Sequence, residues 1–100
     1  MSRGQAVSTV VTAARRRYIL LFLDRYQGAL LAAVLPGLCR EQNFRGTDLA
    51  VVLDDLTWLA TLNLVMLAGN GSETLVHLTP RGERVARDEE RVPGIARPED

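Results

Sequence analysis

Residues 64–78 restrict the fold more than any other stretch of the chain. Residues 64–67 (LVML) read as a β-strand, and residues 74–78 (TLVHL) alternate between polar and apolar as a returning strand does. The six residues between them, AGNGSE, contain Asn-Gly, the dipeptide that two-residue hairpin turns favour. We therefore expect two antiparallel strands joined by a short loop.

Helical patterns precede this hairpin. Residues 7–26 are poor in glycine and proline and predict one long helix. Residues 29–41 predict a second helix, in which Pro36 should cause a kink or a break because it lacks a backbone donor and clashes with the preceding turn. After a turn at residues 43–46, a third helix is expected to run from a cap at Thr47 or Asp48 to about Leu62.

A closing helix should follow the hairpin over residues 79–92, because Thr79 is a good cap and Pro80 suits the first helical turn. Three helices, a two-stranded hairpin and a closing helix predict an α+β, mostly helical, winged helix-turn-helix fold. We expect one domain over residues 1–92 and a loosely ordered, proline-rich tail at residues 93–100.

Three segments carry a family resemblance: DLTWLATLNLV at 55–65, LTPRGERVA at 78–86 and RVPGIARP at 91–98. Together they resemble a family of small winged-helix proteins of Mu-like phages and prophages, often labelled ArsR-like regulators. The resemblance covers roughly residues 15–98 and implies the winged-helix fold and a phage origin more than a mechanism. Pro36 and Asn63 depart from the family pattern, since a glycine would suit the helix end at position 63.

Few side chains are suited to catalysis or metal binding. His77 is the only histidine, and we expect it to point away from the core side of its strand. Cys39 is the only cysteine, which excludes an internal disulfide and a cysteine metal cluster; we expect it to be buried. Asp54 and Asp55 point about 100° apart on a helix and do not converge on one atom. We expect no enzyme, no cofactor and no metal.

The first 23 residues do not predict secretion or membrane insertion. The arginines at 15–17 follow a weak apolar run, the reverse of a signal peptide. The apolar run at 18–23, YILLFL, is too short to span a bilayer. We expect a cytoplasmic protein of a bacterial host cell with no membrane association.

The third helix has the position of a DNA-recognition helix but an unusual composition. A helical wheel gathers its apolar side as Leu49, Val52, Leu53, Leu56, Leu59 and Ala60. We expect Leu53 and Leu56 at the centre of the core. The opposite side carries Val51, Asp54, Asp55, Trp58 and Leu62. Carboxylates and apolar groups do not suit contacts with phosphates and base edges, so Val51, Asp54, Asp55 and Trp58 form a candidate protein-interaction face. Trp58 is either covered by the hairpin or the last helix, or exposed as an anchor.

Charge is unevenly distributed although the formal net charge is zero. Residues 1–45 carry a net charge of +5, residues 46–80 carry −4 without any arginine, and residues 81–100 carry −1. One interpretation is that the arginines pair with acids of the third and last helices, each surface pair contributing about 1 kcal/mol or less. The other is that four arginines bind phosphates beside the helix-turn-helix: Arg40, Arg45, Arg81 and Arg84.

The first helix is apolar on more than one side, which indicates a second partner besides the core. Tyr18 and Phe22 form the candidate interface of a homodimer. Two functions follow. The first is a phage or prophage DNA-binding regulator of transcription. The second is a non-enzymatic interaction module that dimerises through its first helix, does not read DNA with its acidic third helix, and binds a phage or host protein.

Overall fold

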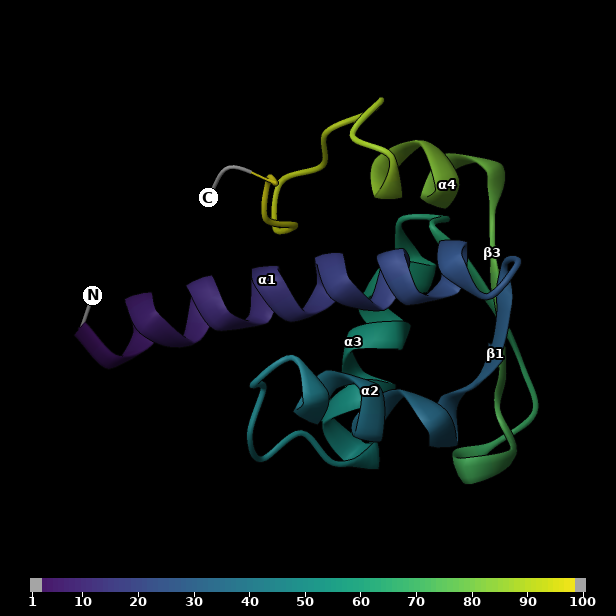
Figure 1. The fold of residues 1–100 in the computed structure, drawn as a ribbon, viewed down its shortest axis with the longest axis horizontal. Coiled ribbons are helices and arrows are strands. Elements are labelled where there is room, and N and C mark those ends of the chain that lie inside the picture. Colours follow the sequence, from purple (N-terminus) through teal and green to yellow (C-terminus); the bar gives the residue numbers. More distant parts are fainter. Residues whose placement is uncertain (1–2, 99–100) are drawn as a thin grey trace.

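The structure, a computed structural model, describes residues 3–98 of the chain, with side chains from Thr9 onward. In that range the chain forms α-helices and one antiparallel sheet, so the α+β class is confirmed (Figure 1). The elements in chain order are α1 (Arg3–Arg25), β1 (Ala29–Leu31), the 3-10 helix η1 (Ala32–Val34), α2 (Leu35–Glu41), α3 (Leu49–Thr61), β2 (Val65–Ala68), the 3-10 helix η2 (Gly71–Glu73), β3 (Leu75–Leu78) and α4 (Pro80–Ala86).

The sheet has three strands, one more than the two-stranded hairpin that the sequence predicted. Strands β2 and β3 pair antiparallel as expected, but β1 pairs with the other edge of β3, giving the order β1-β3-β2. In this register Leu30 and Leu67 both lie opposite Val76. The Ala32 N–H continues the ladder by donating to the Thr74 carbonyl at 2.8 Å.

The prediction of one helix over residues 29–41 is therefore wrong for residues 29–34, which form β1 and η1. Gln27 and Gly28 adopt positive φ values of 66° and 89°, which ends α1 and reverses the chain. The segment then runs along β3, and the Leu78 N–H donates to the Gly28 carbonyl at 2.7 Å. Pairing with a strand that is distant in sequence thus overrides a weak local preference for helix.

Local signals placed the helix ends more accurately. Helix α2 begins at Leu35 with Pro36 in its first turn, which confirms the predicted break, because a missing N–H breaks no helical bond there. The Asp48 side chain accepts from the Val51 N–H and caps α3. The Thr79 hydroxyl caps α4, which ends at Ala86, earlier than predicted.

The core lies where α1 crosses α2, α3 and the inner face of the sheet (Figure 1). Leu56 is fully buried in it, as predicted. Leu53 is only partly buried, so its expected position at the centre of the core is wrong. The buried side of α3 consists of Val52, Asp55, Leu56 and Leu59. By the helical period of about 100° per residue, this side is rotated roughly 50° from the predicted one.

The tail packs against the rest of the molecule where the structure describes it. Residues 92–98 run back beside α1 (Figure 1), and the Ala96 N–H donates to the Ala13 carbonyl at 3.1 Å. Val92 is buried and Ile95 packs against the core. Apolar contacts and a backbone hydrogen bond therefore hold a segment whose proline content had indicated a loose end.

Candidate functional site

Asp55 is buried between two arginines of α1, with 3% of its side chain exposed. The Arg15 Nε atom donates to one carboxylate oxygen and its Nη2 atom donates to the other at 3.1 Å. The Arg16 Nε atom lies 3.7 Å from the carboxylate. The hydrogen bonds to Asp55 raise the pKa of the Arg15 guanidinium above its usual value. The predicted outward position of Asp55 is wrong, whereas the predicted pairing of α1 arginines with an acid of the third helix is confirmed.

Arg16 covers Trp58, and the tail completes the cover. The guanidinium carbon lies 3.7 Å from the centroid of the indole ring, close enough for a cation–π contact. The Arg16 Nη1 atom donates to the Gly94 carbonyl at 3.3 Å. Burial lowers the pKa of Arg16, although the nearby Asp55 opposes this shift. Trp58 is therefore half-buried beneath α1 and the tail, which is neither of the two alternatives that the sequence left open, cover by the hairpin or the last helix and full exposure. We call Arg15, Arg16, Asp55, Trp58 and Gly94 the arginine clasp.

Gly94 fits the clasp because it has no side chain. Its φ of 95° lies in the left-handed region that favours glycine. A Cβ atom there would lie 2.8 Å from Trp58 Cζ2 and 3.3 Å from an Arg16 nitrogen. The glycine of the PGI segment therefore allows the tail to close over the indole.

The exposed side of α3 is small and carries one acid. It consists of four residues, which we call the open face: Ala50, Asp54, Thr57 and Thr61. The Thr57 hydroxyl donates to the Leu53 carbonyl at 2.9 Å, and the Thr61 hydroxyl donates to the Trp58 carbonyl at 2.6 Å. Asp54 is thus the only ionised group of this face.

Only two of the four residues of the predicted protein-interaction face are accessible on α3. Asp54 is exposed and Val51 is half-buried, so both still belong to the accessible surface of α3. Asp55 and Trp58 are engaged in the arginine clasp and do not belong to it. The sequence signal for the burial of Asp55 and Trp58 was the presence of Arg15 and Arg16 in α1 among apolar residues.

Two of the candidate phosphate-binding arginines are exposed: Arg40 in the last turn of α2, and Arg45 in the turn between α2 and α3. The Arg40 Nη1 atom donates to the Thr47 carbonyl at 2.7 Å, which holds the turn beside the α3 cap. Arg45 has no ion-pair partner among the side chains that the structure describes. This turn therefore presents positive charge next to the N-terminus of α3.

The other two candidate arginines, Arg81 and Arg84, lie in α4 and are engaged with acceptors of the same chain. Glu90 accepts a hydrogen bond from Arg81 at 2.6 Å and from Arg84 at 3.2 Å. Arg81 also donates to the Leu62 carbonyl at 2.8 Å. The hydrogen bond from Arg81, followed by that from Arg84, lowers the pKa of Glu90. Both guanidinium groups fasten α4 to its own C-terminal loop, so a role for them in phosphate binding would require breaking these bonds.

The candidate dimer residues are covered within the chain. Phe22 is 4% exposed, and the Tyr18 ring packs edge-on against Phe44 at 5.4 Å between centroids. Phe44, in the turn between α2 and α3, thus covers part of this apolar side of α1, whereas Val11 of the same helix is 41% exposed. A homodimer stays a prediction, but Tyr18 and Phe22 no longer support it.

The outer face of the sheet is apolar and was not predicted. Met66 is 62% exposed and Leu31 is 47% exposed, and they lie on the side of the sheet that carries His77. His77 is exposed while its neighbour Val76 is buried, as the alternation predicted. Leu31 was missed because it belongs to the segment that was interpreted as helix.

Two kinds of site are not found in the described part of the chain. Residues 3–98 contain no helix with the length and apolar character of a membrane span. They also contain no cluster of three or more histidine, cysteine or acidic residues placed to hold a metal ion.

Comparison with known proteins adds no name to this arrangement. No protein-family model matches the chain. No curated protein matches it either.

Proposed function

We propose that the protein is a winged-helix DNA-binding regulator of transcription that acts on phage or prophage genes. The observation that carries the proposal is the neutralisation of Asp55 by Arg15. It leaves Asp54 as the only carboxylate of the open face, beside the exposed Arg40 and Arg45. Burial of Asp55 therefore removes one of the three aspartates of α3 and its cap from the surface that DNA would meet, and leaves Asp48 and Asp54 exposed.

The order of the elements supports the proposal. In this proposal, α2 and α3 with the turn between them act as the helix-turn-helix, and the β2–β3 hairpin acts as the wing. The sequence resemblance to winged-helix proteins of Mu-like phages supports the assignment to phage or prophage genes. A fold hosts many functions, so the surface chemistry has to carry the rest of the argument.

That chemistry favours phosphate contacts over base contacts. The guanidinium groups of Arg40 and Arg45 match phosphate oxygens in shape and charge. The hydroxyl protons of Thr57 and Thr61 are engaged with their own helix, which leaves these oxygens as acceptors only. Phosphate contacts position a protein on DNA without specifying a base. We therefore expect weak, salt-sensitive binding with little sequence selectivity.

The proposal is tested by fluorescence anisotropy on random and phage-derived duplexes. Arg45→Ala should weaken binding to both duplexes and reduce the salt slope by about one, as the loss of one phosphate contact does. Arg25→Ala is the matched control, an exposed arginine at the end of α1, and should leave affinity unchanged. Asp54→Asn should keep or raise affinity because it removes like-charge repulsion. No binding at low salt, or equal losses for Arg25→Ala and Arg45→Ala, would overturn the proposal.

The exposed sheet face supports a second candidate, a non-enzymatic protein-interaction module. Exposed methionine and leucine side chains on one face are suited to contact with another protein, since methionine is enriched at interfaces. A pull-down from phage-infected cells with and without nuclease distinguishes the two functions. Nuclease should remove the captured proteins if DNA bridges them. Nuclease-resistant capture that Met66→Lys abolishes and Arg45→Ala preserves would favour the interaction module.

A further inference from the structure

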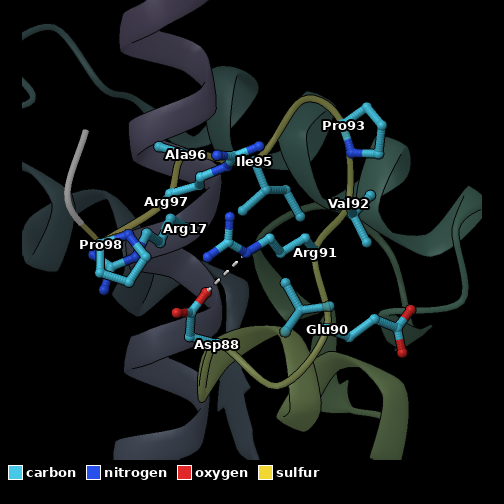
Figure 2. Close-up of a pocket in the computed structure, with 11 residues that line it drawn as sticks. Arg17, Asp88, Glu90, Arg91, Val92, Pro93, Ile95, Ala96, Arg97 and Pro98 are labelled. Carbon is cyan, nitrogen blue, oxygen red and sulfur yellow. Dashed lines mark ion pairs between the residues drawn. The ribbon is translucent and has the colours of Figure 1, made fainter.

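A hollow of about 430 Å³ lies between α1, the loop after α4 and the tail (Figure 2). Ligand pockets for small molecules have volumes of about 300–1,000 Å³ and combine apolar walls with a few polar groups. This hollow has both kinds of wall. It is separate from the open face of α3 and from the arginines of the α2–α3 turn.

The apolar wall belongs to the packed part of the molecule. Val85 and Val92 are each 8% exposed, and Ile95 packs against the core. Figure 2 shows that the tail carries Val92 and Ile95 along one side of the hollow. These side chains offer a fixed surface for the apolar body of a ligand.

The polar wall has an excess of positive charge. Arg17, Arg91 and Arg97 line the hollow together with the acids Asp88 and Glu90. The Asp88 carboxylate lies 4.0 Å from Arg91 and so compensates an arginine of the same wall.

Glu90 does not balance the rest of this charge, because its carboxylate is bound by Arg81 and Arg84, which lie outside the lining. Arg17 enters from α1 and has no carboxylate partner among the described side chains. Arg17 therefore supplies the positive charge with which this wall attracts an anion.

We infer that this hollow binds a small organic oxyanion, a carboxylate or phosphate ester on an apolar body, with Arg17 as a principal contact. A guanidinium group presents a planar fork of donors that matches the two oxygens of such a group. The apolar body lies against the wall of Val85, Val92 and Ile95. The inference does not depend on DNA binding, since none of the residues that carry that proposal line the hollow.

Trp58, the only tryptophan, gives the protein its own reporter of occupancy. The indole contacts Gly94, and the residues on either side of that glycine, Pro93 and Ile95, line the hollow. A ligand seated against the tail should therefore change the Trp58 emission. Isothermal titration calorimetry provides a second measurement that is independent of the fluorophore.

The probes are phenylacetate, phenyl phosphate, inorganic phosphate and 2-phenylethanol, each titrated into the full chain. Phenylacetate or phenyl phosphate should bind, and whichever is tighter assigns the oxyanion. Inorganic phosphate should bind more weakly because it lacks the apolar body, and 2-phenylethanol because it lacks the charge. If neither aromatic oxyanion binds at about 10 mM, or if 2-phenylethanol binds as tightly as phenylacetate, the inference is wrong.

Variants then locate the site. Arg17→Gln should weaken the tighter oxyanion about tenfold, the loss expected for one charge-assisted hydrogen bond. Arg25→Gln changes the same charge on the same helix outside the hollow and should leave affinity within about twofold. Arg97→Gln, on the tail, should also weaken binding. It replaces Arg17→Gln as the test variant if Arg17→Gln does not fold. Unchanged affinity in the folded arginine variants of the hollow, or an equal loss in Arg25→Gln, would overturn the inference.

Discussion

Two neighbouring aspartates divide α3 into a closed side and an open side. Asp55 is 3% exposed and bound by two arginines, while Asp54 is exposed to solvent. The closed side meets α1 and the tail through the arginine clasp. The open side is covered by no other described element and presents small residues around one carboxylate.

The difference teaches that composition alone does not say which acid belongs to the surface. Asp55 can be buried because Arg15, 40 residues earlier, supplies a bidentate partner. Removing two charges from water is unfavourable, so such a pair adds less to stability than to the choice of one packing over another. The clasp thus fixes the rotation of α3 and, with it, which residues form the open face.

The largest effect should come from removing the buried acid. Asp55→Ala should lower the free energy of unfolding by about 3–5 kcal/mol, because it leaves the Arg15 charge buried without a partner. Asp54→Ala is the control and should change stability by about 0.5 kcal/mol or less, as most exposed substitutions do. Urea denaturation measures both.

A double-mutant cycle with Arg15→Ala shows whether this loss comes from the pair. The two changes should be strongly non-additive if Asp55 and Arg15 act together. Equal losses for Asp54→Ala and Asp55→Ala would remove the distinction between the two sides of α3.

The next effect separates the two sides through their leucines. Leu56→Ala should cost about 2–5 kcal/mol, as the truncation of a fully buried leucine does. Leu53→Ala should cost less, about 1 kcal/mol, because Leu53 is only partly buried. Chemical denaturation of the two variants ranks them. A greater loss for Leu53→Ala would mean that α3 has the rotation the sequence first indicated.

A smaller effect tests the contact between the tail and the indole. Gly94→Ala should cost about 1–3 kcal/mol, because it combines a strained positive φ with a collision against Trp58. Gly46→Ala is matched in φ, at 77°, but its Cβ would meet nothing within 4 Å. It should therefore show the backbone strain alone. Trp58 emission should shift to the red in the first variant only, and a shift in both would argue against the tail as its cover.

The sequence predicted those parts of the fold that depend on neighbouring residues. Asn-Gly marked the hairpin, Asp48 and Thr79 marked helix starts, and Pro36 marked the break before α2. Each of these signals acts within a few residues of the structure that it produces.

The remaining parts depend on residues that are distant in sequence. Strand β1 forms because β3, some 45 residues later, has a free edge, and no local pattern in the segment records that partner. Helix α3 is apolar around most of its circumference, so its wheel predicted the wrong rotation; the pair of Arg15 and Asp55, distant in sequence, fixes the observed one.

The smallest effect concerns Cys39, a buried residue of α2 whose thiol lies near the clasp. Burial raises the pKa of this thiol from its ordinary value of 9.0 to about 11, and Arg15 opposes the shift. Between these two values the unfolded chain loses the thiol proton while the folded protein keeps it. The unfolded state then binds fewer protons, so stability falls as pH rises through this window.

We expect the alkaline loss that is due to Cys39 to reach about 1 kcal/mol near pH 10. Cys39→Ala removes it while leaving every other titrating group in place. Urea denaturation of both proteins at a series of pH values gives the difference between their free energies of unfolding. The stability advantage of the wild type over Cys39→Ala should shrink or reverse above pH 9, the ordinary pKa of a cysteine thiol. If the free energies of unfolding of the two proteins change with pH in parallel, water reaches the thiol. The core beside the closed side of α3 is then less well packed than the burial of Cys39 indicates.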